Sequence, residues 1–440
     1  MALRQAPLED LGLTTGSSPA APAPSPSPTG PGPACRFCGR PLALTFVDLG
    51  ASPLANAYLR AEDLDRPETF YPLHARVCEG CWLVQLPAAA PPETLFADYA
   101  YFSSYSDSWL AHCERFAGAA VERFGLGADS RVVEVASNDG YLLRFFAARG
   151  VPVLGIEPAA NVAAAAVEAG IPTVAEFFGR RLAGELAARG ERADLLIGFN
   201  VFAHVPDLND FTAGLAELLA PAGVLALEFP HLLRMIERRQ FDTVYHEHFS
   251  YFSLTTARAV LAAHGLEVFD LEELPTHGGS LRLLARHASG GGEPPSERVV
   301  ELIERERAAG LTTPEPYRAF GEQARALKRR LLAFLLDAAE RGRTVAGYGA
   351  PAKGNTLLNY CGVGPDLLPY TVDRSPHKQG RCLPGSRIPI HAPERIAETR
   401  PDYLWILPWN LREEIAAQMA GIREWGGRFV VAVPEVEVFG

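Results

Sequence analysis

Residues 132–143 read VVEVASNDGYLL, an apolar run followed by a polar turn and the start of an amphipathic pattern. This order predicts a buried strand, a tight turn and a helix, so that a ligand at the turn would meet backbone N–H groups. Helical stretches separate this run from further apolar runs at 153–157, 194–200 and 224–229. The alternation predicts a parallel, doubly wound α/β sheet, which the runs 266–271 and 280–285 would extend at its far edge.

Polar residues near the ends of these strands indicate the ligand. Glu134 lies in the first strand, and Glu157 ends the second strand about twenty positions after the turn, where a carboxylate can accept hydrogen bonds from both ribose hydroxyl groups. The turn has Asn138 at its tip and Gly140 as its one glycine, so it lacks the Gly-x-Gly-x-x-Gly fingerprint. This combination favours S-adenosylmethionine (SAM) over NAD. Ala136 in the turn and Asn200 after the third strand are further candidate contacts.

Two Cys-x-x-Cys pairs precede this unit, formed by Cys35 and Cys38 and by Cys78 and Cys81. The spacing lets four thiolates bind one tetrahedral zinc ion, and a site without an open position should be structural. A redox role of the pairs is the alternative. The long insert between the pairs predicts strands of its own or a substrate-facing loop. The other three cysteines should be free thiols, and they are Cys113, Cys361 and Cys382.

Residues 245–250 read YHEHFS and place imidazole, carboxyl and phenol groups downstream of the SAM turn. A histidine is the natural proton acceptor at neutral pH, and His204, in the loop 200–207, is a further candidate. The zinc-protease pattern His-Glu-x-x-His would need a histidine where Ser250 stands, so we do not expect a metalloprotease. As a strand, the segment would place His246 and His248 on one face and Tyr245 and Glu247 on the other. The alternative is a polar loop at a domain edge.

A second α/β unit follows a charged helical stretch at 296–341. Its strands should be 344–348, 370–373, 403–407 and 428–433, with a helix from about Asn355. The glycine-rich turn between the first strand and this helix contains Gly349, Lys353 and Asn355 and predicts a pyrophosphate site, although it is not a Walker loop. Alternatively, its glycines only permit close packing. Lys378 is a further candidate phosphate contact, or else a solvated side chain.

The chain has 440 residues, a formal net charge of −11 and a pI near 5.6. Nucleic-acid binders and membrane-surface binders need a basic face, so this charge balance argues against both. The sequence contains neither an apolar run of about 18 residues nor a basic segment followed by a hydrophobic run. We therefore expect a cytoplasmic protein with no nucleic-acid or membrane partner. The oligomeric state is not predicted.

The chain resembles the SAM-dependent C-methyltransferases of deoxysugar biosynthesis, which act on nucleotide-linked 4-keto sugars. The resemblance covers nearly all of the chain after residue 34. It rests on the two cysteine pairs and on the motifs at 99–108, 134–140, 200–207, 245–250, 277–282 and 347–362. It implies zinc in the first domain, SAM in the second, and a sugar nucleotide, thymidine diphosphate-linked in our prediction, held mainly by the third.

The expected fold is therefore α/β in three domains after a tail. The four segments are a disordered Pro/Ala/Ser-rich tail at 1–34, a small zinc-binding domain at 35–104, a Rossmann-like SAM-dependent methyltransferase domain at 105–290 and a Rossmann-like sugar-nucleotide-binding domain at 291–440. The resemblance makes His248 the base that removes the proton from sugar C3. It places Tyr245, Glu247, His204 and Tyr99 around the substrate.

The expected chemistry is methylation at C3, because the C4 ketone makes the C3 proton acidic enough for a positioned imidazole to remove. The resulting carbanion then attacks the methyl group of SAM, and the zinc ion lies remote from this step. Three alternatives remain at this point: an O- or N-methyltransferase with the same fold, an NAD-dependent sugar oxidoreductase and a non-catalytic zinc-ribbon regulator.

Overall fold

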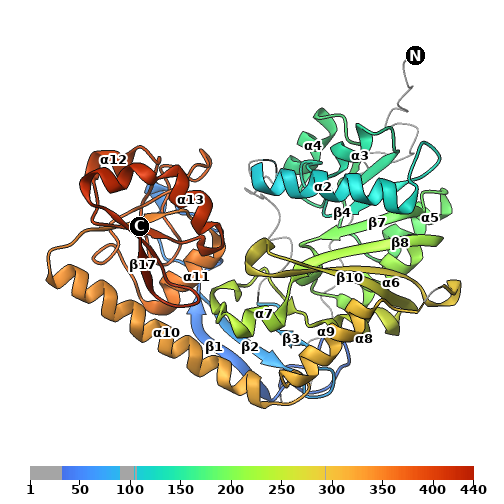
Figure 1. Cartoon of the computed structure of the whole chain (residues 1–440), viewed down its shortest axis with the longest axis horizontal. Helices are drawn as coiled ribbons and strands as arrows, with labels where there is room; N and C mark the ends of the chain where they lie inside the picture. Colours follow the sequence, from blue (N-terminus) through green and yellow to red (C-terminus); the bar gives the residue numbers. More distant parts are fainter. Residues whose placement is uncertain (1–31, 90–103, 105–106, 293) are drawn as a thin grey trace.

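The computed structural model describes residues 32–89, 104, 107–292 and 294–440. Most of the predicted tail and the candidate Tyr99 lie outside the described residues. Within those residues the chain forms three β-sheets, one in each part of the sequence that was predicted to fold separately (Figure 1). None of the described helices combines the length and the apolar character that crossing a membrane requires.

The first sheet has the strand order β1-β2-β3-β9 and is antiparallel throughout. Its strands are β1 (Leu44–Ser52), β2 (Tyr71–Val77), β3 (Val84–Gln85) and β9 (Ser250–Tyr251). β1 and β2 lie between the two cysteine pairs, so the insert does form strands. β9 directly follows the segment 245–249, and its pairing with β3 anchors that segment to the cysteine-containing unit.

The central sheet has the strand order β10-β11-β8-β7-β4-β5-β6. Its strands are β4 (Val132–Val135), β5 (Val153–Ile156), β6 (Thr173–Val174), β7 (Ala193–Phe199), β8 (Leu219–Pro230), β10 (Leu266–Leu274) and β11 (Ser280–His287). β4 to β8 are parallel to one another, whereas β11 runs antiparallel to β8 and β10 antiparallel to β11. The predicted doubly wound sheet with a strand pair at its edge is confirmed.

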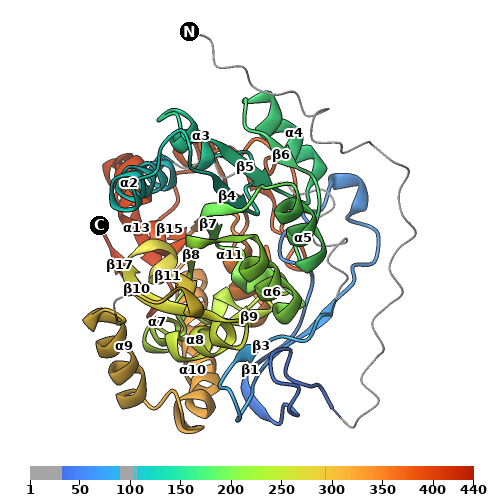
Figure 2. The same cartoon turned by 90° about the vertical axis from the view of Figure 1, so that its right-hand side faces the viewer.

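Helices cover both faces of this sheet (Figure 2). They are α2 (Asp107–Phe124), α3 (Leu143–Ala147), α4 (Ala160–Glu168), α5 (Arg180–Ala188), α6 (Leu208–Leu218) and α8 (Leu254–Ala263), whereas α7 (Leu232–Glu237) packs into the core that the first sheet shares with the C-terminal unit. Val133 and Val135 pack with α5, α6 and α8 on one face, while Val132 packs with α2 and α3 on the other. The two-residue side-chain period of β4 therefore sorts its residues between two cores.

The C-terminal sheet has the strand order β14-β13-β12-β15-β16-β17. Its strands are β12 (Val345–Tyr348), β13 (Thr371–Val372), β14 (Ile390–His391), β15 (Tyr403–Ile406), β16 (Arg428–Val431) and β17 (Glu437–Phe439). Among these described strands, neighbours are parallel except for β16 and β17, which are antiparallel. Its helices are α11 (Ala352–Cys361), α12 (Arg395–Thr399) and α13 (Arg412–Gln418). The helix predicted from about Asn355 begins three residues earlier, which brings Lys353 into its first turn.

The stretch 296–341 forms two helices, α9 (Glu297–Ala308) and α10 (Glu315–Glu340). Gly310, with φ at +78°, ends the first, and Pro314 precedes the second, because neither residue type favours continuation of a helix. α10 runs from the methyltransferase part to the C-terminal part and packs along β1 (Figure 1). The rings of Phe46 and Phe320 stack there at 4.2 Å, so this helix joins all three parts of the chain.

Candidate active site

A cavity of ≈ 2340 Å³ lies where the three parts of the chain meet. The loops at the carboxyl ends of β4, β5, β7 and β8 line one side, which is the edge where ligands bind in sheets of this type. The segment 245–248, the beginning of α11 and Asn56 from the cysteine-containing unit line the rest. The cavity is therefore built from residues far apart in the sequence.

The turn after β4 and the end of β5 form the part that fits SAM. Ala136 and Asn138 adopt left-handed backbone conformations with φ of 57° and 50°, which non-glycine residues adopt mainly at functional sites. Glu157 accepts the Asn138 N–H at 3.1 Å through Oε2 and the Ala159 N–H at 2.9 Å through Oε1. Each carboxylate oxygen keeps a lone pair for a ribose hydroxyl group, so the predicted contact is geometrically available.

Four predicted cofactor residues, Glu157, Ala136, Asn138 and Asn200, line the cavity, but Glu134 and Gly140 do not. Glu134 shares the face of β4 that packs against α2 and α3, where burial raises its pKa and the Tyr141 hydroxyl opposes that rise. A Cβ on Gly140 would lie 2.8 Å from Ile171 Cγ1. Close packing therefore requires a glycine at position 140. The sequence predicted that Glu134 and Gly140 would contact the ligand directly, but neither residue lines the cavity.

The segment 245–248 is a turn and not a strand, because the His248 N–H donates to the Tyr245 carbonyl oxygen at 2.9 Å. Tyr245, Glu247 and His248 line the cavity together. His246 does not line it, and its Nε2 contacts the Pro72 carbonyl oxygen at 3.2 Å. Of the two arrangements that the sequence left open, the strand does not occur, and the turn brings residues from both faces of such a strand to one side.

His248 is held as a neutral base. Its Nδ1 lies 2.9 Å from the Thr243 carbonyl oxygen, which can only accept, so the proton is on Nδ1. Nε2 then accepts from the Tyr245 hydroxyl at 2.7 Å. Burial, followed by the nearby His204, holds the pKa of His248 well below its usual value. The two imidazole rings lie 4.7 Å apart, and burial lowers the pKa of His204 to about 4.

Asn56 is a cavity residue that sequence reasoning did not identify. It comes from the loop after β1, and its Nδ2 donates to Glu247 Oε1 at 2.7 Å. Burial raises the pKa of Glu247 to about 7, and the Asn56 hydrogen bond opposes that rise. The insert between the cysteine pairs thus forms both strands and a cavity-lining loop, whereas the sequence predicted one or the other.

Lys353 lies in the first turn of α11 and lines the cavity. Its Nζ donates to Asn410 Oδ1 at 3.0 Å and lies 4.8 Å from the centre of the Trp409 ring. Burial lowers the pKa of Lys353, and Asp242 opposes this. Asp242 itself accepts the Trp409 indole N–H at 2.6 Å, so the ammonium group has no direct ion pair within the described residues. A half-buried cation of this kind, at the wall of a cavity, fits an anionic ligand.

The other predicted phosphate contacts differ in position. Lys378 lines the cavity, but its Nζ donates to the Ala350 carbonyl oxygen at 3.0 Å and lies 3.6 Å from Asp373 Oδ2. Gly349 and the fully buried Asn355 do not line it. A Cβ on Gly349, whose φ is +90°, would lie 2.6 Å from Pro408 Cδ, and its N–H already donates within the sheet. Gly349 thus has the packing role that the sequence left open as an alternative.

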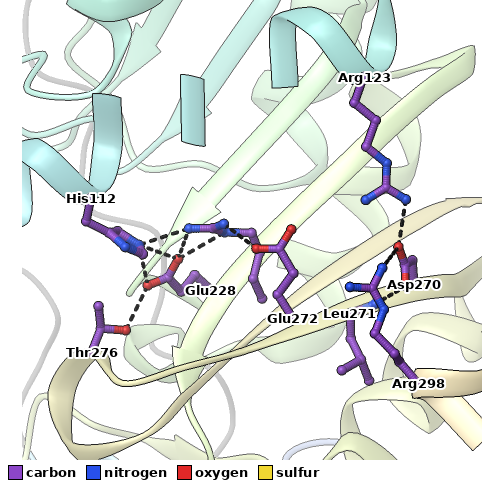
Figure 3. A network of polar contacts seen from close by, with 9 residues as sticks. His112, Arg123, Glu228, Asp270, Leu271, Glu272, Thr276 and Arg298 are labelled. Carbon is purple, nitrogen blue, oxygen red and sulfur yellow. Dashed lines mark hydrogen bonds and ion pairs between the residues drawn. The ribbon is translucent and has the colours of Figure 1, made fainter. Parts of the chain in front are cut away.

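A buried polar network at the end of β8 was also missed (Figure 3). Glu228 accepts from Arg282 Nη2 at 2.8 Å and from the Thr276 hydroxyl at 3.1 Å, and it lies 3.0 Å from His112 Nε2. Arg282 Nη1 donates to Glu272 at 2.7 Å. Burial alone would raise the pKa of Glu228, but His112 and Arg282 outweigh it and lower the pKa. The network ties α2 to β8 and β11, and His112, Thr276, Arg282 and Glu272 line the cavity.

A second cluster lies around Asp270 on β10, the strand that also carries Glu272 (Figure 3). Asp270 on β10 pairs with Arg123 of α2 and with Arg298 of α9, each at 2.6 Å. Arg123 also lines the cavity, whereas Asp270 does not. This cluster holds the C-terminal end of α2 in place, and α2 forms part of the cavity wall.

His277 is a further cavity residue with a strained backbone, its φ being 54°. Its Nε2 lies 3.2 Å from Asn200 Nδ2. Because an amide nitrogen only donates, Nε2 is the acceptor, and the proton of the neutral ring is on Nδ1. Burial, followed by the charge of Lys353, lowers the pKa of His277 to about 4. The sequence motif at 277–282 marked this residue without giving it a role.

The four cysteines of the two pairs come together at one point. Their sulfur atoms all lie within 4.8 Å of one another, with Cys35 and Cys81 at 3.6 Å and Cys38 and Cys78 at 3.4 Å. Sulfur atoms around tetrahedral zinc are separated by about 3.8 Å, so the four thiolates fit that ion. None of them lines the cavity, which agrees with a structural site. The seven cysteines are unpaired by disulfides, and all lie in the described residues.

Comparisons with known proteins match the whole architecture. Family models match as a zinc binding domain at 35–96, a methyltransferase domain at 109–271 and a C-methyltransferase C-terminal domain at 275–434. The chain is 39% identical to the C-methyltransferase NovU of Streptomyces niveus over 92% of this chain and 96% of that protein.

Two other similar proteins share only part of the chain. A ubiquinone biosynthesis O-methyltransferase of Rhodopseudomonas palustris is 28% identical over 30% of this chain and 60% of its own length. The solved structure of the magnesium protoporphyrin IX methyltransferase ChlM of Synechocystis PCC 6803 with bound SAM covers 46% of this chain and 99% of that chain, with 17% identity and a TM-score of 0.33. From the full-length match and the domain matches, the chain belongs to the family of SAM-dependent C-methyltransferases with an N-terminal zinc-binding domain and a C-terminal α/β domain.

Proposed function

We propose that this C-methyltransferase acts on a nucleotide-linked 4-keto-deoxysugar, thymidine diphosphate-linked in the first instance, and methylates it at C3. The observation that carries the proposal is the neutral His248, whose proton-accepting Nε2 is in a cavity shared with the SAM turn and with the half-buried cation Lys353. O-methylation and N-methylation start from groups that already carry a lone pair. A buried base is needed when the acceptor is a carbon acid.

The proton transfer follows from the orientation of His248. Nε2 takes the proton from C3, and the electrons of the C–H bond form the enolate of the C4 ketone. The Tyr245 hydroxyl donates to Nε2 at 2.7 Å, and this hydrogen bond must break before Nε2 can accept the C3 proton. The released hydroxyl and His204 are candidates to stabilise the enolate oxygen, because both line the cavity. SAM, when bound, supplies the electrophilic methyl group that C3 attacks.

The low pKa of His248 fits this role. Because burial holds the pKa well below the usual value, the ring is neutral at neutral pH. It carries its one proton on Nδ1, so Nε2 is available as a base. A base with a low pKa is weak, so the step also needs a closely held substrate and a stabilised enolate. Lys353 and the N–H groups at the beginning of α11 are proposed to hold the diphosphate, and Lys378 is proposed as a more distant contact.

The remaining sequence predictions belong to the same proposal. Tyr99 stays a candidate substrate contact. The four domain boundaries and a cytoplasmic location stay proposals, the latter supported by the absence of disulfides among the seven cysteines, all of which are described. The match to a C-methyltransferase over nearly the whole chain disfavours the alternative of a small-molecule O- or N-methyltransferase.

The test is mass spectrometry of the protein incubated in heavy water with SAM and a panel of thymidine diphosphate 4-keto-deoxysugars. Methyl gain, or SAM-independent deuterium incorporation at C3, is the expected result. If neither occurs across the panel while SAM binds, the acceptor is not a keto sugar of this class. His248→Ala should keep SAM binding and lose both signals. His246→Ala is the matched control, because His246 belongs to the same turn but does not line the cavity.

A second variant tests the diphosphate contact. Lys353→Ala should weaken sugar-nucleotide binding by about tenfold or more, the effect of losing one charge-assisted hydrogen bond, and should leave SAM binding nearly unchanged. Lys328→Ala is the control, since Lys328 Nζ donates to the Tyr360 carbonyl oxygen outside the cavity. A greater loss of SAM binding than of sugar-nucleotide binding in Lys353→Ala would contradict this assignment.

A further inference from the structure

The loop after β1 carries a side chain of the cysteine-containing unit into the cavity. Asn56 lines the cavity beside Glu247 and His248, and its Nδ2 donates to Glu247 Oε1 at 2.7 Å. Glu247 is only 4% exposed, and within the described residues this is the one hydrogen bond that its carboxyl group makes. A buried carboxyl group with a single donor depends strongly on that donor.

The amide of Asn56 is fixed from its other side. The Tyr58 hydroxyl lies 2.7 Å from the Ala350 carbonyl oxygen and 3.2 Å from Asn56 Oδ1. A carboxylate oxygen of Glu247 only accepts, so Nδ2 is the Asn56 atom that faces it. Leu59 and Cys382 exchange a pair of backbone hydrogen bonds at 2.9 Å. The loop is therefore attached to the C-terminal unit on one side and contacts the catalytic turn on the other.

We propose that Asn56 is a positioning residue of the methyl-transfer site, whose amide holds the Glu247 carboxylate in the orientation in which it accepts hydrogen bonds from the acceptor substrate. The cysteine-containing unit thus contributes to the reaction site itself, although its metal site lies outside the cavity lining. The proposal rests on the C-methyltransferase activity and does not require the acceptor to be a sugar.

The protonation state of Glu247 provides a readout. The groups facing it are Tyr58 on the loop, Lys378 beyond Tyr58, His204, whose ring hydrogen-bonds to the Glu247 backbone, and its neighbour His248. Burial raises the pKa of Glu247 to about 7, and the Asn56 hydrogen bond opposes this rise. Removing the amide raises the pKa further, so the carboxyl group becomes protonated at neutral pH and loses acceptor capacity.

The experiment compares the pKa of Glu247 in wild type, Asn56→Ala and the nearly isosteric Asn56→Asp. The measurement is an infrared titration of the substrate-free protein labelled with 13C-glutamate, in which Glu247→Gln identifies the band. We expect an upward shift of about 1 to 2 pH units in Asn56→Ala, and an upward shift in Asn56→Asp from the added like charge. The acidic limb of the methyl-transfer pH profile should move by the same amount.

Glu68→Gln is the matched control. Glu68 lies in the same insert and accepts from the Gly385 N–H at 2.7 Å and from Arg387 at 2.8 Å, so it attaches the insert to the C-terminal unit away from the cavity. An unchanged Glu247 pKa in both Asn56 variants, or an equal shift in Glu68→Gln, would overturn the proposal. Failure of wild type to methylate the keto-sugar panel would reject the proposed substrate, whereas the infrared titration would still decide the role of Asn56.

Discussion

Replacement of Gly278 should disturb the contact between the methyltransferase and C-terminal units. Gly278 lies in the turn between β10 and β11 with φ at +92°, and a Cβ there would lie 2.4 Å from Trp409 Cη2 and 2.7 Å from Gln240 Nε2. The Trp409 ring cannot move freely, because its indole N–H donates to Asp242 and Lys353 Nζ lies 4.8 Å from the ring centre. Gly278→Ala must therefore displace a ring that is held from two sides.

The expected loss of unfolding free energy is about 2 to 4 kcal/mol. A left-handed φ costs an L-residue about 1 to 2 kcal/mol, and overpacking adds about 1 to 3 kcal/mol. The reduced entropy of the unfolded chain offsets about 0.4 to 1 kcal/mol. Gly265→Ala is the control, because Gly265 has φ at +75° and open space around its Cβ position. Its loss should be about 1 kcal/mol, so the difference between the variants isolates the contact with Trp409.

Urea denaturation followed by tryptophan fluorescence measures both variants, and binding of sugar nucleotide and SAM is measured in parallel. We expect Gly278→Ala to unfold at lower urea than Gly265→Ala. We also expect it to lose sugar-nucleotide affinity, because Lys353 Nζ lies 4.8 Å from the centre of the displaced ring. Equal denaturation midpoints and equal affinities in the two variants would refute the reasoning.

Three further predictions concern the metal, the cofactor and pH. Removal of zinc with a chelator, or Cys78→Ser, should abolish methyl transfer, although no cysteine of the cluster lines the cavity. The reason is that β1, β2 and Asn56 lie between the two cysteine pairs and depend on the metal for their fold. Zinc content and activity, measured together with Cys382→Ser as the control, check this prediction. Glu157→Gln should weaken SAM binding by about 10- to 100-fold in calorimetry, whereas Glu168→Gln on the exposed face of α4 should have no effect. Burial lowers the pKa of His277 to about 4, so the unfolded state binds one more proton between about pH 6.5 and 4 and stability falls as the pH falls through that window. His277→Asn, which tolerates the left-handed backbone, should remove up to about 1.4 kcal/mol per pH unit of that slope in urea titrations, and an unchanged slope would contradict the assigned shift.

Much of the fold could be predicted from local patterns. The apolar runs at 153–157 and 194–200 became β5 and β7, because a buried parallel strand needs a continuous apolar segment. The cysteine spacing predicted the cluster at Cys35 to Cys81, since two thiolates separated by two residues can reach one ion. Glu157 and His248 were identified as cavity residues because each follows a recognisable local element or motif.

The sequence-based expectations and the structure differ where a local pattern allowed two arrangements. Glu134 was expected at the ligand, but the face of β4 that it occupies is covered by α2 and α3. For the segment 245–248 the sequence left a strand and a polar loop open, and the closure between Tyr245 and His248 forms a turn that directs His246 toward Pro72. Gly349 was expected to form a phosphate cradle, but Pro408 occupies the space beside it. Each outcome depends on a neighbour that is distant in the sequence.

The sequence by itself determined the cysteine-containing unit, the two α/β units and the cofactor class, and it proposed most of the side chains that line the cavity. These follow from hydrophobic period, turn residues and ligand spacing, which act over a few residues. Only the tertiary structure brought Asn56, Glu247 and Lys353 around one cavity and placed Trp409 against Gly278. Contacts between units depend on how separately formed cores pack against each other, and the spacing of residues along the chain does not encode that packing.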